Sequence, residues 1–389
     1  MFHIFKRLIE MMKYFVKKFF FFLIIDRTNS LNKIFINSES MILFITHNFK
    51  GGTIQYENNF IQENNCNVIV LKLITHGKIL AYSLENKLTN EKILLNNKSF
   101  SVILNYKFQK IIVNSLVSAN NIKELFDVLK SYKIKYQSIP LYYLVHDFHC
   151  ICPKYNLIEK NRYCNLDCNT YKCKFHYYPD CTTMSVNVWR DLWASFLTCV
   201  DKVICFSRSS KELILEAYPR LGEEKIFVNP HSMDWCRFTK IKQFSGAQLH
   251  VAIVGKVDTI PKGKIVVQEI LSRTSSVIPF YLIGTTANEI KSKRKNISYF
   301  GKYKHDQLQS ILENLQINLV VFPSICPETF SYLISELIMM DLPIVCLDFG
   351  AQAEKVKNYN KGVVVKDIEN MINYIEEANQ KGVCYNEYN

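Results

Sequence analysis

Short apolar runs that alternate with amphipathic stretches constrain the fold of this chain more than any other feature. Buried strands are predicted at 41–46, 68–73, 110–113, 141–145, 202–206 and 226–228, and again at 249–254, 280–284, 297–300, 317–322 and 362–365. Helices are predicted at 121–131, 186–197, 209–217 and 368–378. This alternation indicates an α/β fold with doubly wound parallel sheets, whose ligands bind at the carboxyl ends of the strands.

The composition indicates what class of protein this is and what kind of partner it binds. At 389 residues, with 48% hydrophobic and 21% charged residues, the chain can form two domains that each bury a core. Its net charge of +13 predicts an anionic partner. Because the basic residues are spread along the chain without a zinc-finger or RNP-type signature, we expect a membrane surface or a phosphorylated substrate and no nucleic acid. The thirteen cysteines are expected to be mostly reduced cytoplasmic thiols.

The first 27 residues mix aromatic and aliphatic side chains with six Lys or Arg residues at 6, 7, 13, 17, 18 and 27. Their uninterrupted apolar run, 19–25, is far shorter than the ~20 residues that span a bilayer. We therefore predict a basic amphipathic helix that lies on an anionic membrane, which would place the protein at the inner face of that membrane. A signal peptide, for which no small-residue cleavage site follows, and a helix packed on the first domain are the alternatives.

The stretch from Phe322 to Glu336 places two carboxylates beside a buried strand. A Pro-bounded loop follows the strand at 317–322, and an amphipathic helix is expected from about Thr329. Glu328 would then lie at the start of the helix, with Glu336 about 12 Å along its axis at ~1.5 Å per residue. The backbone N–H groups of residues 329–331 would bind an anion there. Two ordinary surface glutamates are the alternative.

The elements around these glutamates are Phe-Pro-Ser at 322–324, Pro-Glu-Thr-Phe at 327–330, Leu-Pro-Ile-Val at 342–345 and Gly-Ala at 350–351. In order and spacing they resemble the nucleotide-sugar site of the large group 1 family of retaining GT-B glycosyltransferases. The resemblance implies two Rossmann-like domains facing across a cleft, at 41–228 and 229–380, after an N-terminal segment at 1–40 and before a tail at 381–389. It also implies that Glu328 orients the hydroxyls of the donor sugar, that Glu336 binds ribose, and that the backbone of Thr329 and Phe330 binds the diphosphate.

Other positions gain a role from the same resemblance. Gly51 and Gly52 follow the first strand, where the absence of Cβ atoms lets the backbone approach a ligand, and in the family such a pair faces the donor phosphates. His146 ends the strand at 141–145 and would flank the reacting carbon as a catalytic residue; a structural histidine is the alternative. Lys256 and Lys262 match the spacing of the family's diphosphate clamp, although Lys replaces the usual first Arg and the bidentate fork is lost.

A cysteine-rich insertion at about 150–181 is the most distinctive local feature. Cys152, Cys164, Cys168 and Cys173 lie in a polar stretch with little apolar content, where four thiolates could hold a structural zinc ion. Their spacings are looser than a Cys-x2-Cys pair. Zinc and plain reduced cysteines therefore both stay open. No thiol is paired with a dedicated base, so a catalytic cysteine is not expected.

The resemblance implies transfer of a sugar, with retention, from a nucleotide diphosphate-sugar to a glycan or polyprenyl-linked acceptor in surface polysaccharide assembly. No cofactor is expected to be required for catalysis, because the two lysines and the helix start could stabilise the leaving diphosphate. The leaving phosphate would accept the proton, by analogy with the family. A nucleotide-sugar 2-epimerase of the same fold and a non-catalytic carbohydrate-binding scaffold at the membrane are the rival functions.

Overall fold

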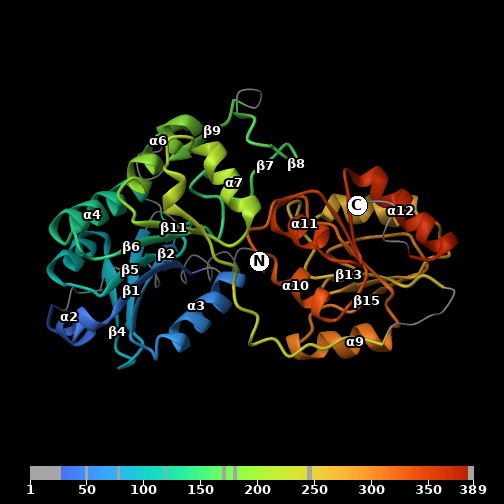
Figure 1. The fold of residues 1–389 in the computed structure, drawn as a ribbon, viewed down its shortest axis with the longest axis horizontal. Coiled ribbons are helices and arrows are strands. Elements are labelled where there is room, and N and C mark those ends of the chain that lie inside the picture. The colour runs from blue at the N-terminus through green and yellow to red at the C-terminus, as the bar shows by residue number, and fades with distance from the viewer. Residues whose placement is uncertain are drawn as a thin grey trace, which may run out of the picture. The chain divides into compact units, whose positions relative to one another are not determined.

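The computed structural model describes residues 28–48, 51–76, 79–117, 119, 121–168, 172–177, 182–242 and 248–383. The expected amphipathic helix within 1–27 and most of the expected tail lie outside these residues. The chain forms two compact units (Figure 1). The first contains the residues up to Leu144 with Phe175–Met184 and Asp191–Val203, and the second contains Val145–Lys174, Ser185–Arg190 and the residues from Ile204 onward.

The first large sheet has eight strands in the order β12-β11-β6-β5-β1-β2-β3-β4. Their bounds are β1 Ile42–His47, β2 Val68–His76, β3 Ile79–Asn86, β4 Lys92–Asn96, β5 Lys110–Val113, β6 Leu141–Leu144, β11 Lys202–Cys205 and β12 Ile226–Val228. β1 pairs in parallel with β2 and β5, but β3 runs antiparallel to both β2 and β4. The predicted parallel pairing is thus confirmed for β1, β2, β5 and β6, whereas β3 and β4 were not predicted; the two residues between β2 and β3 leave room only for a hairpin.

The helices in this half of the chain are α2 Thr28–Ile34, α3 Gly52–Glu63, α4 Ile122–Lys135, α6 Val186–Leu197 and α7 Arg208–Ala217, with 3-10 turns at Ser38–Ser40, Asn97–Asn105 and Glu223–Lys225. Two small sheets pair β7 Ile158–Glu159 with β8 Arg162–Tyr163 and β9 Lys174–Tyr177 with β10 Thr182–Ser185. α4 packs on α6 through Phe126, whose ring centroid lies 4.2 Å from that of Phe196 and 4.9 Å from that of Trp193. Aromatic side chains thus supply much of this core.

The second large sheet has six strands, β13 Val251–Val254, β14 Phe280–Ile283, β15 Ile297–Tyr299, β16 Leu319–Phe322, β17 Ile344–Leu347 and β18 Gly362–Val365. Their order is β15-β14-β13-β16-β17-β18, and every pair is parallel. The chain thus adds strands on one side of β13 and then on the other. The carboxyl ends of β13 and β16 form the switch point where such sheets bind ligands.

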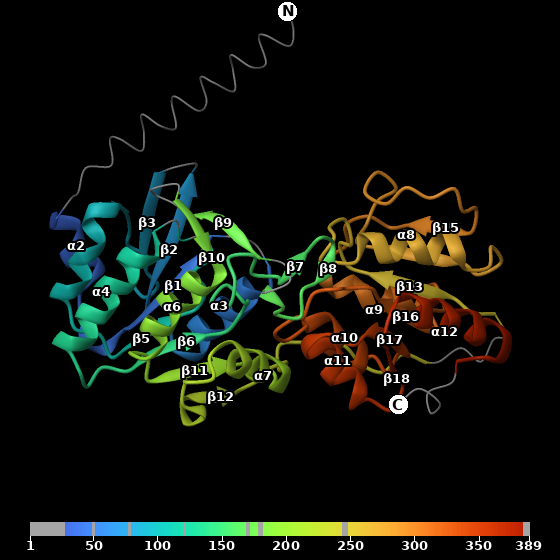
Figure 2. The same cartoon turned by 90° about the horizontal axis from the view of Figure 1, so that it is seen from above.

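Helices cover both faces of the six-stranded sheet (Figures 1 and 2). They are α8 Lys264–Arg273, α9 Leu308–Asn314, α10 Tyr332–Met339, α11 Gly350–Lys357 and α12 Ile368–Lys381, with a 3-10 turn at His305–Gln307. Val251 and Ile253 pack with α8 and α12, whereas Ala252 and Val254 pack with α9, α10 and α11. Alternate residues of a strand therefore serve two cores, which explains why the strand is apolar throughout.

Among the described residues, none of the helices combines the length and the hydrophobicity needed to cross a bilayer.

Candidate functional site

The loop from β16 to α10 carries the expected site, but its form differs from the prediction. α10 begins at Tyr332 and not at about Thr329, and Ser331 before it adopts the left-handed conformation with φ of 60°. Thr329 and Phe330 are therefore loop residues, and both are buried. Since Glu328 also lies outside the helix, the expected separation of the two glutamates along a helix axis does not apply.

The start of α11 holds this loop in place. The Ala351 N–H donates to the Glu328 carbonyl at 2.9 Å, and the Glu328 N–H donates to the Gln352 side chain at 2.9 Å. The Gln352 amide in turn donates to the Cys326 carbonyl at 2.7 Å. Gly350 lets the start of α11 approach the loop, because a Cβ at this position would lie 2.6 Å from Pro327 Cα. The φ of Gly350 is 58°, which also favours glycine. The Gly-Ala element noted in the sequence thus has a steric reason.

Lys262 and Glu328 come together from loops that follow β13 and β16. Lys262 Nζ lies 2.6 Å from Glu328 Oε1, and the two side chains are 52% and 16% exposed. The charge of Glu328 raises the pKa of Lys262. Burial acts to raise the pKa of Glu328, but Lys262 and Lys355 outweigh it and the net pKa is lowered. Both groups are therefore ionised at neutral pH, and about half of the Lys262 side chain is exposed.

Lys256 lies in a different ionic cluster. Its Nζ is 2.9 Å from Asp258 Oδ2 and 3.5 Å from Glu289 Oε1, and its side chain is 60% exposed. A hydrogen bond with Asp258 and the charges of both carboxylates raise its pKa. The two lysines of the expected diphosphate clamp thus each have a carboxylate partner here, which an anionic ligand would have to replace.

His146 also lies against the β16–α10 loop. It follows β6, and its backbone carbonyl accepts a hydrogen bond from the Thr329 hydroxyl at 3.1 Å. Its ring centroid lies 4.4 Å from that of Phe206 and 5.1 Å from that of His231. The structure therefore brings this strand end, selected from the sequence, together with the segment that carries Glu328.

Glu336 is buried in α10, where its Oε1 lies 3.0 Å from His305 Nε2. The ring of His305 stacks on that of Phe238 with centroids 4.8 Å apart. His305 was not predicted as the partner of Glu336, because a lone histidine between strands carries no motif. This carboxylate is thus oriented by the imidazole of His305, which begins the 3-10 turn before α9.

Gly51 and Gly52 belong to the first unit, between β1 and α3. Gly52 begins α3, and Gly51 precedes it with φ of 152°, a conformation that favours glycine. A Cβ at Gly51 would have no atom within 4 Å. Neighbouring protein atoms therefore leave open space at this position.

The four cysteines predicted as possible zinc ligands differ in burial. Cys152 and Cys164 are buried, and Cys168 and Cys173 are partly buried. Burial raises the pKa of the Cys152 thiol to about 12, and the other three thiols add to that effect. Within the described ranges no group of three or more His, Cys, Asp or Glu side chains is arranged to hold a metal ion. Zinc therefore stays a prediction, which metal analysis of the purified protein beside Cys164→Ser would test.

Two residues near Glu328 were missed from the sequence. His231, near the predicted start of the second domain, is buried with its ring centroid 4.0 Å from that of Phe206 and 4.4 Å from that of Phe330. Burial, helped by the charge of Lys355, lowers the pKa of His231 to about 3. Lys355 lies over the Phe330 ring at 3.2 Å. Its helix was not recognised in the sequence, so nothing marked the side chain as inward-facing.

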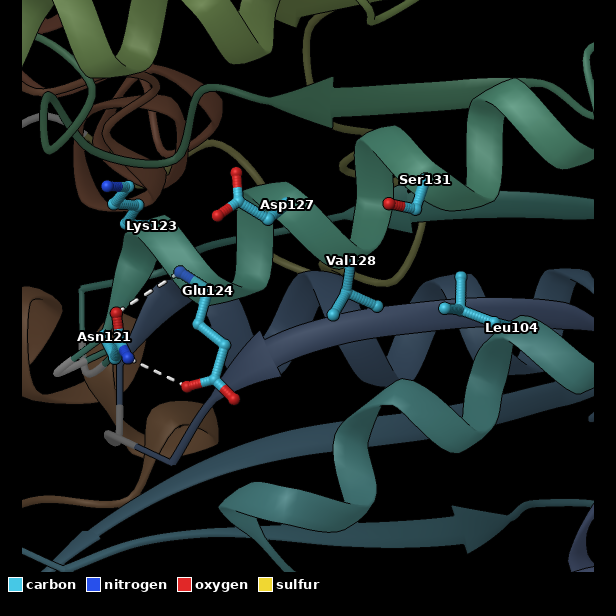
Figure 3. A pocket seen from close by; sticks show the side chains of 7 residues that line it. All are labelled: Leu104, Asn121, Lys123, Glu124, Asp127, Val128 and Ser131. Atoms are coloured by element: carbon cyan, nitrogen blue, oxygen red, sulfur yellow. Dashed lines mark hydrogen bonds between the residues drawn. The ribbon is translucent and has the colours of Figure 1, made fainter.

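A separate pocket of about 390 Å³ lies along α4 in the first unit (Figure 3). It is lined by Leu104, Asn121, Lys123, Glu124, Asp127, Val128 and Ser131. Asn121 and Glu124 use their side chains to cap the helix, with bonds of 3.2 and 2.8 Å. The polar groups at this end of the pocket thus have a structural role.

Comparison with known proteins agrees with the geometry of the second sheet. Residues 245–380 match the family model described as glycosyl transferases group 1. The matched segment contains all six strands of the second sheet together with Lys256, Lys262, Glu328 and Glu336. No curated protein matches the chain in sequence.

Solved structures resemble the chain over most of its length. Anabaena HepE in complex with UDP has a TM-score of 0.54 at 14% identity, over 89% of this chain and 92% of that one. The lipopolysaccharide outer core galactosyltransferase WaaB has a TM-score of 0.58 at 12% identity, with the same two coverages. Sucrose-phosphate synthase from Thermosynechococcus elongatus has a TM-score of 0.53 at 13% identity, over 88% and 90%. Residues 245–380 thus match the glycosyl transferases group 1 model, and the chain has the GT-B fold of these structures.

Proposed function

We propose that this protein transfers a sugar, with retention of configuration, from a nucleotide diphosphate-sugar to a glycan or polyprenyl-linked acceptor hydroxyl. The observation that carries the proposal is the Lys262–Glu328 pair at the switch point of the six-stranded sheet. It places one accessible cation and one ionised carboxylate 2.6 Å apart, where doubly wound sheets bind nucleotides. The family match over the same residues supports this assignment.

The chemistry of the transfer requires stabilisation of an anion. As the bond to the anomeric carbon breaks, negative charge develops on the diphosphate and positive charge on the sugar. Lys262 and Lys256 would hold the diphosphate, and the charge they neutralise grows toward the transition state. In this proposal the diphosphate replaces Glu328 as the partner of Lys262, and the released carboxylate accepts hydrogen bonds from sugar hydroxyls.

The remaining roles follow the arrangement around the loop. Glu336 would exchange its bond to His305 for one to the ribose. His146 would flank the anomeric carbon, with its strand end held to the loop through Thr329. The backbone of Thr329 and Phe330 would contribute N–H groups to the diphosphate, although these residues precede α10 and do not form its first turn. Gly51 and Gly52 would let the backbone of the first unit approach the donor.

The acceptor and the location are inferred from other observations. The name of the structurally similar WaaB, an outer core galactosyltransferase of lipopolysaccharide, fits a role in surface polysaccharide assembly. The basic N-terminal sequence supports attachment to an anionic membrane at its inner face. If deletion of residues 1–27 leaves partition into anionic liposomes unchanged, this part of the proposal is wrong.

Donor binding tests the function directly. Wild type would be titrated with UDP-, GDP- and dTDP-sugars and assayed for slow donor hydrolysis, with and without EDTA. Lys262→Ala and Glu328→Ala are expected to reduce turnover at least about 100-fold, as loss of a single transition-state contact does elsewhere. Lys357→Ala is the matched control, because its pair with Asp348 is exposed and lies in the same domain. Failure of wild type to bind any donor would contradict the proposal and favour a non-catalytic scaffold.

A further inference from the structure

Lys355 is a partly buried cation beside the loop that carries Glu328. Its Nζ lies 3.2 Å from the centroid of the Phe330 ring, donates to Ser335 Oγ at 2.5 Å, and donates to the Ser331 carbonyl at 3.3 Å. One contact is thus with α10 and two are with the loop that precedes it. All of these residues belong to the second compact unit.

The direct partners of this ammonium are neutral. Among the described residues, no carboxylate lies within 4.0 Å of Lys355 Nζ. The two carboxylates whose charge acts on it, Glu328 and Glu354, each bind other groups. Glu328 pairs with Lys262 at 2.6 Å, and Glu354 accepts the backbone N–H groups of Arg208 and Ser209 at 3.1 and 2.9 Å. A cation with neutral partners in a partly buried site costs free energy, and this cost disfavours its protonated form.

The contacts of Lys355 fall on the turn that determines where Glu328 lies. Ser331 adopts the left-handed conformation, which an L-residue keeps only when its surroundings impose it. Lys355 binds the carbonyl of that residue and covers the face of the preceding aromatic ring. The ammonium thus stabilises the turn between Glu328 and α10 without lying in the Lys262–Glu328 pair.

We propose that Lys355 is a positioning residue of the donor site: its ammonium holds the Phe330–Ser331 turn and thereby keeps Glu328 in the position that binds the donor. The inference rests on the proposed function, since it assigns a role in donor binding. It adds a third lysine, one that acts through the loop and does not touch the donor.

The protonation equilibrium supports this role. Burial lowers the pKa of Lys355 to about 7, against the charges of Glu328 and Glu354. The titratable groups that face it are Glu328 from the loop, Glu354 from its own helix and His231 from the segment after β12; α10 presents the Ser335 hydroxyl. Glu328 stays ionised and His231 stays neutral near pH 7, because both pKa values are lowered. Within this cluster Lys355 is therefore the group that changes charge.

The direction of the effect follows from the sign of the shift. A lysine with a lowered pKa is protonated below about pH 7 and neutral above it. When a donor takes Lys262, Glu328 loses its main counter-charge and its field favours protonation of Lys355. Donor binding should therefore take up a proton near pH 7 and weaken as the pH rises. If only the protonated form binds, the dissociation constant should increase roughly 25-fold between pH 6.5 and 8.5.

The experiment measures donor affinity of the full chain from pH 6.5 to 8.5, with the sugar nucleotide that wild type binds tightest in the UDP, GDP and dTDP panel. Lys355→Met should bind weakly at every pH, because it keeps the length but loses the charge. Lys355→Arg should bind with little pH dependence, since guanidinium stays charged. Lys357→Met, two residues along the same helix and exposed, should retain the affinity and slope of wild type.

Calorimetry on wild type provides a test that does not depend on a variant that folds. Titration at pH 7 in two buffers with different ionisation enthalpies should show uptake of about half a proton per donor bound. Donor binding with no proton uptake and a flat pH profile would overturn the role of Lys355 and leave the proposed function intact. Wild-type affinity and slope in Lys355→Met would do the same. Absence of donor binding by wild type would overturn both proposals.

Discussion

Two helices of this protein, α4 and α10, begin in different ways. α4 follows a local rule: Asn121 accepts the Glu124 N–H at 3.2 Å, and its amide donates to the Glu124 carboxylate at 2.8 Å. α10 has no side-chain cap, and the residue before it is held in the left-handed conformation. Contacts from α11, more than ten residues later, fix the segment that leads into it. The start of α4, which depends on neighbouring residues, was predictable from sequence. The start of α10 depends on distant contacts, and it lies at the candidate site.

The largest expected effect comes from breaking the distant contacts. Gly350→Ala would place a Cβ 2.6 Å from Pro327 Cα in a backbone with φ of 58°. We expect a loss of about 4 kcal/mol in the free energy of unfolding, from overpacking together with the left-handed penalty. Urea unfolding would measure it, and donor affinity should also fall because the Glu328 backbone must move. A variant as stable as wild type would show that α11 does not hold the loop.

A smaller loss is expected from Gln352→Leu, which keeps the volume but removes both bonds to the loop. Gln352 is fully buried, so the Glu328 N–H and the Cys326 carbonyl would lose their partners. Groups left unsatisfied in this way cost about 2 to 3 kcal/mol together. The same unfolding series measures the effect. Wild-type stability of Gln352→Leu would show that these two bonds do not hold the loop.

Breaking the local start of α4 should reduce the free energy of unfolding by less. Asn121→Ala removes both side-chain bonds at the beginning of α4, and loss of an N-cap typically costs about 1.5 kcal/mol or less. Donor affinity should stay at the wild-type value, because no residue of the proposed donor-binding loop lies in this helix. Thermal unfolding with donor titration would check both expectations. A change in donor affinity comparable to that of Gly350→Ala would remove the distinction between the two helices.

The same difference explains what the sequence could and could not predict. Strands β5, β12 and β18 and helix α6 follow the predicted bounds, because the strands are short continuous apolar runs and the helix is an amphipathic stretch. Lys262 and Glu328 were selected as members of one site, and the fold brings them together across 66 residues. The start of α10 was misplaced by three residues because Lys355 and Gln352, which fix the preceding turn, lie on a helix that the sequence pattern did not reveal.

Ser331 offers the smallest effect, and its sign distinguishes the two kinds of helix start. Ser331→Gly and Ser331→Ala both remove the hydroxyl and differ in the cost of the left-handed conformation. If distant contacts impose that conformation, Gly should be more stable than Ala by about 1 kcal/mol, because glycine adopts it without strain. If the helix instead began near Thr329, residue 331 would lie in the first turn, and Ala would be more stable by about the same amount. Unfolding of the two variants side by side therefore reports whether contacts from α11 impose the conformation of the Phe330–Ser331 turn. The proposed role of Lys355 requires that they do.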